Sequence, residues 1–479
     1  MEQLDEKISD VFGELSIYKS PTINTMFSNK TLPSFIKDWL IKKYTMSNRQ
    51  IDKDGMIDFM NKHLVGSINN VKRKLTVDNE TVSLLSRFRI ETDIKNNVLR
   101  FEVPDVGIKI SDGVIPKYVA EENPTLKDGE HWGVISLMYE PPVGKAKGVI
   151  NLYKFKPFQP YLVSLEMFRE FRKQFSIDEW INILVKAMEY NPYECGEYGF
   201  SSVDKKLLLI SRLLVFVQPN LNLIELAPKG TGKSYVFSNL SKYGWMFSGG
   251  KVTRAKLFYD MGTKAPGIIT QKDYVAFDEI STISFSDTSE MLGALKGYLE
   301  SGKFTLSNFE GTSSAGIILL GNIAITKEGK PKNACFMKEL PPMFQESALL
   351  DRFHGFIEGW DLIRINEDIL LDGVTINVEY FSEILHQLRD DASYNMVVSD
   401  LIDVPDGADT RDKNAIFRIA TGYLKLLFPH VQNKHDISYD DFENYCLIPA
   451  IKKRAIIKEQ ISMLDPEFKN YVPDFTVKR

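Results

Sequence analysis

The spacing of apolar and polar residues changes twice along the chain. Over roughly the first 75 residues, apolar positions recur at helical spacing, most clearly in Leu32–Tyr44 and Met56–Leu64. From Ser83 to Phe155 the period falls to two, and Asn, Asp, Gly and Pro separate short runs rich in β-branched and aromatic residues. The pattern predicts helices followed by five strands that fit a small barrel. The predicted strands are Leu84–Thr92, Val98–Val103, Val106–Ile110, Gly133–Tyr139 and Gly148–Phe155.

Strands and helices alternate after a predicted linker at Pro157–Leu162. Ser176 has N-cap character, with Asp178 and Glu179 in the first turn of a helix that ends near Tyr190. Further predicted elements are the helix Val203–Val215, the strand Tyr274–Phe277, the helix Thr288–Leu299, a β-ribbon over Lys303–Leu320, and the helices Lys413–Leu427 and Tyr439–Met463. The alternation is typical of an α/β core with a parallel sheet. The predicted domains are 1–80 (helical), 81–160 (small β), 161–400 (α/β core) and 401–479 (helical lid and C-terminal tail).

Residues 221–240 read LNLIELAPKGTGKSYVFSNL, an apolar strand that breaks at a glycine-rich turn before a helix-compatible segment. Gly230 and Gly232 allow backbone N–H groups to face phosphate oxygens. Lys233 can reach the β- and γ-phosphates, and Ser234 can bind Mg²⁺. Ala227 stands where the usual pattern has its first glycine. The segment predicts a phosphate-binding loop, with a chance glycine-rich turn as the alternative. The loop residues are Ala227, Pro228, Lys229, Gly230, Thr231, Gly232, Lys233 and Ser234.

Two carboxylates follow the next apolar strand. Asp278 and Glu279 end the run YVAFDE, and Asp278 lies 45 residues after Lys233. Asp278 is suited to holding the Mg²⁺ shell, and Glu279 to polarising the water that attacks the γ-phosphate. An acidic pair in a loop at a strand end is the alternative; the phosphate loop upstream favours the catalytic interpretation.

Two further polar residues stand next to apolar segments, one at the end of a run and one before a run. Asn322 ends the run GIILLGN and can hydrogen-bond the γ-phosphate or the attacking water, although by itself it also fits a strand-terminating turn. Arg352 in LLDRFHGF is a candidate arginine finger for a nucleotide bound by a neighbouring subunit. A salt bridge to Asp351 or a solvent-exposed arginine explains this residue equally well.

Basic and aromatic residues interleave near the last predicted strand of the β region, where Lys154 and Lys156 alternate with Tyr153 and Phe155. Such a mixture is used for binding single-stranded nucleic acid by stacking, and a small five-stranded barrel can be of the oligonucleotide-binding (OB) type. An edge strand with buried aromatics and exposed lysines gives the same pattern. The pattern is compatible with both interpretations.

Composition narrows the class of protein. With 479 residues, 43% apolar and 26% charged, the chain is globular in character and long enough for about two to four domains. The net charge of −5 makes it no polycation, so nucleic-acid contacts would need a local basic surface. The three scattered cysteines, Cys195, Cys335 and Cys446, favour a reducing compartment. The acidic N-terminus and the absence of a long apolar run predict a soluble cytoplasmic protein without a membrane partner.

The series APKGTGKS, YVAFDE, LLGN and LLDRF resembles the AAA+ ATPases. This resemblance implies ATP and Mg²⁺ as the bound species, with Asp278 as the metal-binding residue and Glu279 as the catalytic carboxylate. It also implies that Asn322 is a sensor of the bound nucleotide and that Arg352 acts in trans.

Within AAA+, the LLDRF form, the β-ribbon before the sensor strand and TRDKNAIFRIATGYL at residues 410–424 are similar to the MCM-helicase branch. Arg411 falls where that branch has its nucleotide-binding sensor-2 arginine. Arg418 matches a second basic position of the same helix. The resemblance implies that Arg411 contributes to the ATP site from the lid.

A closer resemblance covers nearly the whole chain. The stretches LIELAPKGTGKSYVFSNLSKY, SGGKVTRAKLFYDM, LLDRFHGFIEGW, TGYLKLLFPH and LPSFIKDWLIKKYTMS are similar to the BrxL family, the Lon-protease-like AAA+ proteins of bacteriophage-exclusion (BREX) defence. Membership implies a homo-oligomer, a hexameric ring or stacked double ring, that binds DNA in its channel and acts in phage restriction with other BREX proteins. It implies an α/β AAA+ P-loop ATPase core with a helical lid, preceded by helices and an OB-like barrel.

The sequence departs from this family near its end. Longer members carry a Lon-protease-like domain after the ATPase, whereas some 17 residues follow Ser462, too few for a domain of ordinary size. No Ser–Lys or Ser–His–Asp arrangement stands out in the sequence. Proteolytic activity is therefore not expected.

The resulting hypothesis is a ring-forming ATPase that couples ATP hydrolysis to DNA engagement. In the resembling helicases the ribbon points toward the channel, which makes Lys303 and Asn308 candidate DNA contacts; an exposed hairpin without a ligand explains them as well. Two alternatives remain: an unfoldase working with a separate protease, for which Phe304 and Phe309 would be the channel aromatics, and a nucleotide-switched scaffold of a defence complex.

Overall fold

A computed structural model describes residues 2–27, 32–46, 51–64, 68–124, 126, 129–142, 144, 147–157, 163–193, 202–306 and 309–479. It divides into two compact units, each described by itself. The large unit comprises Met1–Asp38 and Val163–Arg479, and the small unit comprises Trp39–Leu162. The predicted linker residues 158–162, Cys195 and Asn308 lie outside the described residues.

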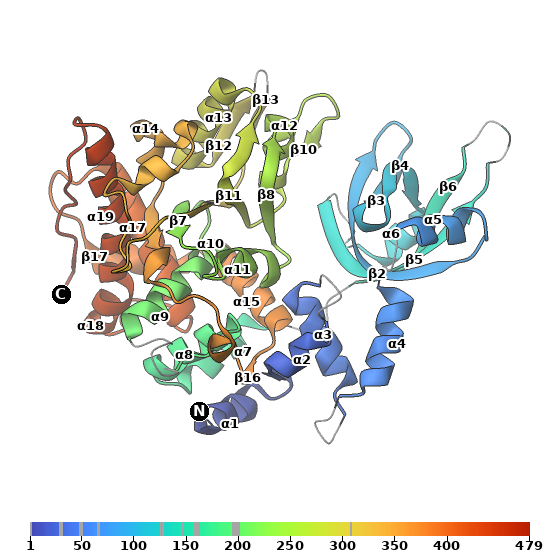
Figure 1. Ribbon diagram of the computed structural model, residues 1–479, viewed down its shortest axis with the longest axis horizontal. Helices are drawn as coiled ribbons and strands as arrows, with labels where there is room; N and C mark the ends of the chain where they lie inside the picture. Colours follow the sequence, from blue (N-terminus) through green and yellow to red (C-terminus); the bar gives the residue numbers. More distant parts are fainter. Residues whose placement is uncertain are drawn as a thin grey trace. The chain divides into compact units, whose positions relative to one another are not determined.

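A five-stranded parallel sheet forms the centre of the large unit (Figure 1). Its spatial order is β15-β7-β14-β11-β8, and every neighbouring pair is parallel. The strands are β7 (Leu223–Ala227), β8 (Gly244–Val252), β11 (Tyr274–Phe285), β14 (Gly316–Asn322) and β15 (Gly355–Glu358). Helices pack on the strands. Nearly all side chains of β7 and β14 are buried, and both strands are apolar apart from Glu225 in β7 and the terminal Asn322 in β14. The carboxyl ends of all five strands therefore meet at one edge.

The helices of the large unit begin where the sequence supplies caps. Ser176 and Glu179 form a reciprocal capping box at the start of α8 (Ile177–Ala187), as the pattern of Ser followed by acidic residues predicts. The other helices are α1 (Glu2–Phe12), α2 (Pro21–Thr25), α7 (Leu165–Lys173), α9 (Val203–Ile210), α10 (Leu214–Val217), α11 (Lys233–Asn239), α12 (Arg254–Leu257), α13 (Thr288–Ser301), α14 (Ser347–Leu350), α15 (Val378–Asp390), α16 (Ser393–Leu401), α17 (Thr410–Leu427), α18 (Tyr439–Phe442) and α19 (Ile448–Leu464).

The C-terminal helix runs without a break from Tyr439 to Leu464, as predicted over Tyr439–Met463, but it widens locally. Between α18 and α19 lies a π-helical stretch, Glu443–Leu447. Pro449 follows in the first turn of α19. A proline lacks the N–H and its ring clashes with the carbonyl four residues back, which explains the local widening of the helix.

The first residues of the chain belong to the large unit. The strand β1 (Ser16–Lys19) pairs antiparallel with β16 (Gly373–Ile376). The Lys19 ammonium lies 2.7 Å from the carboxylate of Asp38, and both side chains are almost fully buried. The boundary between the units consequently falls inside α3 (Ser34–Tyr44), not at residue 80. The sequence does not reveal this boundary because the strand partner lies near the other end of the chain.

A short hairpin precedes the central strand β14. It consists of β12 (Lys303–Leu306) and β13 (Phe309–Thr312). The ribbon predicted over Lys303–Leu320 is therefore two elements, since the apolar run from Gly316 joins the parallel sheet instead. The remaining short strands of the large unit are β9 (Tyr259–Asp260), β10 (Ala265–Pro266), β17 (Ile402–Asp403) and β18 (Thr476–Val477).

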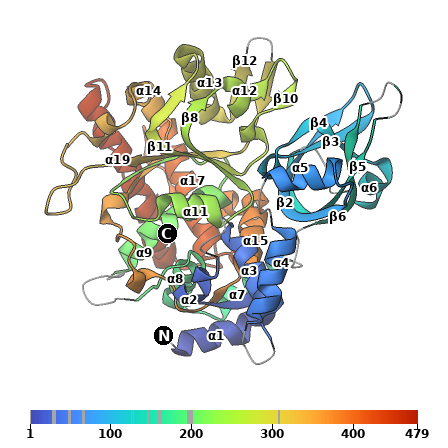
Figure 2. The same cartoon turned by 45° about the vertical axis from the view of Figure 1, so that its right-hand side comes forward.

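A closed five-stranded barrel dominates the small unit (Figure 2). Its order is β2-β3-β4-β6-β5, with β4 and β6 parallel. The strands are β2 (Val82–Asp93), β3 (Val98–Val103), β4 (Ile108–Ile115), β5 (Gly129–Glu140) and β6 (Val149–Pro157), and the helices are α4 (Lys53–His63), α5 (Ile68–Thr76) and α6 (Lys117–Glu122). The third strand starts later than predicted because Pro104–Val106 form a 3₁₀ turn that ends at Gly107 with φ +68°.

None of the described helices combines the length and apolar character needed to cross a lipid bilayer.

Candidate functional site

The loop between β7 and α11 carries two glycines in left-handed conformation. Gly230 has φ +85° and Gly232 has φ +73°. A Cβ on Gly232 would lie 2.0 Å from the Tyr190 hydroxyl and 2.7 Å from Cδ1 of Ile365, whereas no described atom lies within 4 Å of a Cβ built on Gly230. The loop is thus packed on one side at Gly232 and open at Gly230, where a ligand can approach the backbone.

Ala227 replaces the first glycine of the usual phosphate-loop pattern without strain. It is the last residue of β7 and pairs in parallel register with Asn322 of β14. Its carbonyl accepts a hydrogen bond from the N–H of Ile323 at 3.2 Å. Because this position is regular strand, it does not require the conformational freedom of glycine.

A buried ion pair supports the loop from below. The Arg212 guanidinium binds Glu225 of β7 with Nη2–Oε1 2.6 Å and Nε–Oε2 3.0 Å, and both side chains are fully buried. Its Nη1 also donates to the carbonyl of Thr231 at 2.9 Å. Arg212 therefore ties the loop backbone to the sheet. The sequence analysis missed this pair, although a glutamate inside an apolar strand and an arginine inside an apolar helix are a detectable signal.

Lys233 and Asn322 meet at the carboxyl edge of the sheet. The Lys233 ammonium donates to Oδ1 of Asn322 at 2.8 Å. Asn322 ends β14, which lies between β7 and β11 in the sheet. Burial of the ammonium lowers the pKa of Lys233, against the opposing charges of Glu225 and Asp278. The structure thus brings together the loop lysine and the predicted sensor asparagine.

The two predicted carboxylates lie within a long strand, not at its end. β11 continues from Tyr274 to Phe285, and its pairing with β8 is interrupted between Asp278 and Ile283. Glu279 adopts φ +48°, which is strained for a residue with a Cβ, and its side chain is exposed. The buried Asp278 carboxylate accepts the Glu279 N–H at 2.9 Å. The irregularity turns Glu279 outward while Asp278 stays at the sheet edge.

Ser234 and Asp278 offer oxygen ligands suited to Mg²⁺. The Ser234 side chain is half-buried in the first turn of α11, and Asp278 is 6% exposed. Mg²⁺ prefers hard oxygen ligands and is commonly held by one or two carboxylates together with substrate phosphates and water. The donor set therefore fits a magnesium ion that accompanies a nucleotide. Residues 227–234, 278–279 and 322 are called the loop edge below.

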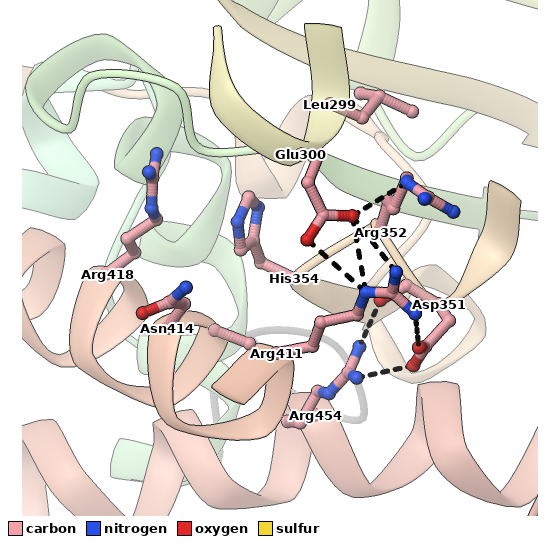
Figure 3. A pocket seen from close by; sticks show the side chains of 10 residues that line it. Leu299, Glu300, Asp351, Arg352, His354, Arg411, Asn414, Arg418 and Arg454 are labelled. Atoms are coloured by element: carbon pink, nitrogen blue, oxygen red, sulfur yellow. Dashed lines mark hydrogen bonds and ion pairs between the residues drawn. The ribbon is translucent and has the colours of Figure 1, made fainter. Parts of the chain in front are cut away.

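Arg352 and Arg411 lie together in a second cluster, the arginine pocket, shown in Figure 3. The pocket measures about 20 Å³, room for about one water molecule. No loop-edge residue lines it. The pocket is formed by Glu300, Asp351, Arg352, Arg411, Arg418 and Arg454, with His354 beside them.

Carboxylates meet the guanidinium groups of this pocket. Glu300 lies 2.8 Å from Nε of Arg352 and 3.1 Å from Nη2 of Arg411. Asp351 binds Nη1 of Arg411 at 2.8 Å and Nη2 of Arg454 at 2.6 Å. The salt bridge considered for Arg352 in the sequence therefore exists, but to Glu300. The adjacent Asp351 pairs with the other arginines.

Arg418 and His354 complete the cluster. Arg418 donates to the carbonyls of Pro219 and Asn220 at 3.1 and 2.7 Å. His354 Nδ1 accepts the N–H of Asn222 at 2.9 Å. Burial, with Arg418 and Arg454 nearby, lowers the pKa of His354 well below its usual value, so the ring is neutral at pH 7.

The candidate DNA contacts of the hairpin divide into exposed and buried residues. Lys303 is exposed, and Asn308 lies outside the described residues. Phe304 is 2% exposed, and Phe309 stacks on Tyr259 with ring centroids 3.8 Å apart. Both aromatic rings are thus engaged within the large unit.

The barrel lysines point outward and the aromatic between them points inward. Lys154 and Lys156 are exposed on β6. Phe155 is 8% exposed and packs against Phe88 in the barrel core at 5.3 Å between ring centroids. Phe155 therefore cannot stack on a base, whereas the two exposed lysines and the half-buried Tyr153 of this pattern remain as nucleic-acid candidates.

A buried polar network that the sequence did not suggest joins the N-terminal segment to the helix after the phosphate loop. Glu189 binds Lys19 at 2.5 Å and accepts a hydrogen bond from Tyr235 of α11. Tyr235 also shares a hydrogen bond of 2.7 Å with Ser34. The network holds α11 against the first residues of the chain.

Comparison with known proteins assigns the family. The family model described as "Lon-like protease BrxL-like, ATPase domain" matches residues 150–474, and "BREX system Lon protease-like protein BrxL N-terminal" matches residues 10–139. An uncharacterised protein of Acidianus filamentous virus 1, ORF426, is 23% identical over 311 residues, covering 57% of this chain and 69% of its own length.

Two relatives match along nearly the whole chain. The Lon-like protease BrxL of Escherichia coli O9:H4 (strain HS) is 26% identical over 471 residues, 96% of this chain. The Lon-like protease BrxL of Bacillus cereus (strain H3081.97) is 25% identical over 474 residues, 97% of this chain. The chain spans 65% and 67% of the lengths of these two relatives. It belongs to the BrxL family of BREX Lon-protease-like proteins and carries the ATPase domain of that family.

Proposed function

We propose that the loop edge binds ATP with Mg²⁺ and hydrolyses it, as a P-loop ATPase of the AAA+ type. The observation that carries this proposal is the hydrogen bond from Lys233 to Asn322. Asn322 ends β14, which lies between β7, the strand before the phosphate loop, and β11, the strand that carries Asp278 and Glu279. Lysine, metal-binding carboxylate, catalytic carboxylate and polar sensor are the groups that phosphoryl transfer needs at one place.

Each loop-edge residue has a distinct part. The backbone N–H groups of Gly230 to Lys233 would hold the phosphates, with the Lys233 ammonium beside them. Ser234 and Asp278 would hold Mg²⁺, which neutralises phosphate charge when bound. The exposed Glu279 would orient and polarise the attacking water, and Asn322 would hydrogen-bond the γ-phosphate or that water.

The arginine pocket supports a shared site between subunits. Arg352 and Arg411 line one pocket, to which no residue of their own phosphate loop contributes, so we propose that both act on the nucleotide of a neighbouring copy of this chain. Such a head-to-tail contact closes into a ring, for which a hexamer or a stacked double ring is proposed.

DNA is the proposed substrate of the ring, in BREX-type phage defence. A closed five-stranded barrel with one parallel strand pair supports an OB-type barrel. Its exposed Lys154 and Lys156, and the exposed Lys303 of the hairpin, are the residues that we propose for phosphate contacts. The unfoldase alternative loses support because Phe304 is buried and Phe309 is stacked on Tyr259.

Mixing two inactive variants tests the shared site. Lys233→Ala removes the loop lysine and Arg352→Ala removes the trans arginine, so each subunit supplies what the other lacks. Their mixture should recover part of the ATPase rate, while each variant alone stays inactive. A mixture as inactive as its components would contradict the trans assignment.

Duplex DNA binding over a salt series tests the nucleic-acid proposal. Phosphate contacts predict a steep fall of affinity with salt, and each lost contact lowers the slope of log K against log salt by about 1. Lys154→Ala/Lys156→Ala should lower the slope by about 2, and the exposed Lys109→Ala in the same barrel serves as control. Affinity independent of salt would refute DNA binding through these contacts.

A further inference from the structure

One carboxylate holds both arginines assigned to the neighbouring nucleotide. Glu300 is the penultimate residue of α13, and its Oε2 lies 2.8 Å from Arg352 and 3.1 Å from Arg411. In Figure 3, dashed lines join its carboxylate to both guanidinium groups. An anionic γ-phosphate that enters the pocket must therefore compete with Glu300 for the same donors.

Glu300 is the replaceable partner in this cluster. Its side chain is 42% exposed, whereas that of Asp351 is 3% exposed and is held by the buried Arg454. Exposed ion pairs are weak, while a buried carboxylate between two arginines is costly to disrupt. Of the two carboxylates in the pocket, Glu300 is therefore the one that solvent, or an entering phosphate, can reach and replace.

The chain runs from Glu300 directly into the hairpin. Gly302 ends α13 with φ +72°, and its N–H donates to the carbonyl of Tyr298 at 2.7 Å. The N–H of Ser313, just after the hairpin, donates to the Gly302 carbonyl at 2.9 Å. A displacement of the end of α13 is therefore passed to both ends of the hairpin.

Arg418 joins the pocket to the same hairpin base by a second route. It donates to the carbonyl of Asn220 at 2.7 Å. Asn220 in turn donates from Nδ2 to the Ser313 carbonyl at 2.8 Å and from its backbone N–H to Ser314 at 2.7 Å. The hairpin base is thus fixed from two sides of the arginine pocket.

We propose that Glu300 is a positioning residue that couples nucleotide to the hairpin. It holds Arg352 and Arg411 when the neighbouring site lacks ATP, and it releases them when the γ-phosphate takes its place. The freed end of α13 then shifts β12 and β13, which carry Lys303. This inference rests on the proposed function, in which both arginines act on the neighbour's nucleotide.

The test is steady-state ATPase kinetics of Glu300→Gln, with and without duplex DNA. Without the competing carboxylate the arginines accept phosphate more readily, so KM for ATP should fall about fivefold. Stimulation by DNA should disappear, because the end of α13 no longer changes its contact with the arginines when the γ-phosphate binds them. A merely structural loss would raise KM or lower kcat, the opposite of this expectation.

Two variants control the experiment. Glu290→Gln removes a carboxylate from the same helix, where Glu290 pairs with Arg254 outside the pocket, and should behave as the wild type. Glu300→Asp keeps the charge but shortens the side chain, so its KM should lie between those of the wild type and Glu300→Gln. If Glu300→Gln does not fold, an unchanged KM in Glu300→Asp still overturns the inference.

The failures of the two proposals are distinguishable. Wild-type KM and DNA stimulation in Glu300→Gln would overturn the role of Glu300, even where mixtures of Lys233→Ala and Arg352→Ala recover activity. No recovery in those mixtures would overturn the shared site itself. If DNA does not stimulate the wild type, KM alone tests the competition: a fall in KM of Glu300→Gln supports it, and an unchanged KM overturns it.

Discussion

The cationic side chains of the loop edge and of the arginine pocket have different kinds of partner. At the loop edge the ammonium of Lys233 donates to a neutral amide, Asn322, and Gly230 leaves open space beside the backbone. In the arginine pocket, by contrast, Arg352 and Arg411 are paired with carboxylates in a space of about 20 Å³. The first region is ready to receive an anion, whereas the second must exchange partners first. This difference is what we expect of the proposed site, which two subunits would share.

The strongest way to break this comparison is Glu279→Gln. Because the amide cannot act as a general base, the ATPase rate should fall by about 10²–10⁴-fold while ATP binding persists. Turnover and nucleotide affinity measured on the same preparation check this. A rate near that of the wild type would remove the catalytic role from the loop edge.

Arg212→Met tests what the loop edge depends on. The variant leaves Glu225 buried without its partner, so the free energy of unfolding should fall by about 3–5 kcal/mol. Urea unfolding measures the change, and Arg364→Met on the surface should shift it by less than about 0.5 kcal/mol. A fall below about 1 kcal/mol would mean that the ion pair does not support the loop.

Asp351→Asn addresses the arginine pocket. Burial raises the pKa of the Asp351 carboxyl, but the charge of Arg454 and hydrogen bonds from Arg411 and Arg454 outweigh burial and hold the pKa below its usual value. Since the folded pKa lies below the unfolded one, this stabilisation is present above about pH 4 and is lost as the pH falls through the folded pKa.

At pH 7 the Asp351→Asn variant should therefore be less stable by about 2–3 kcal/mol, and the difference should shrink below about pH 4. Unfolding midpoints over a pH series provide the check. A stability difference that stays constant across the series would show that the Asp351 carboxylate does not carry this stabilisation.

The smallest expected effect belongs to Ala227→Gly, which restores the usual loop pattern. Because Ala227 is regular strand, glycine should cost about 0.5–1 kcal/mol of stability and give no gain in nucleotide affinity. Gly230→Ala is the matched opposite, since its φ of +85° disfavours a Cβ and should weaken ATP binding. Tighter binding by Ala227→Gly would contradict the strand assignment.

The sequence predicted those elements whose apolar periodicity or capping residues lie within the element itself. The phosphate-loop strand, the capping box at Ser176 and the barrel strand Val98–Val103 follow from apolar periodicity and capping residues within a few positions. The parallel sheet follows from the alternation of strands and helices. The carboxylates and Asn322 were found because they stand at the ends of apolar runs, and Arg352 because it precedes one.

Contacts between segments that are far apart in the chain could not be predicted from the sequence. The pairing of β1 with β16, the Arg212–Glu225 pair and the bridge from Glu300 to Arg352 and Arg411 depend on tertiary packing. The positive φ of Glu279 also has no local signal, since glutamate is not a residue that favours that conformation. These contacts determine how the site is held, while the local patterns determine which residues form it.

The pairing of Ser16 with Ile376 has a consequence for synthesis on the ribosome. At about 5–20 residues per second, β1 waits roughly 20–70 s before β16 is made. The barrel strands, which lie within residues 82–157, are complete long before then. The small unit can therefore fold first, while β1 remains an unpaired strand edge that a chaperone or a neighbouring nascent chain can bind.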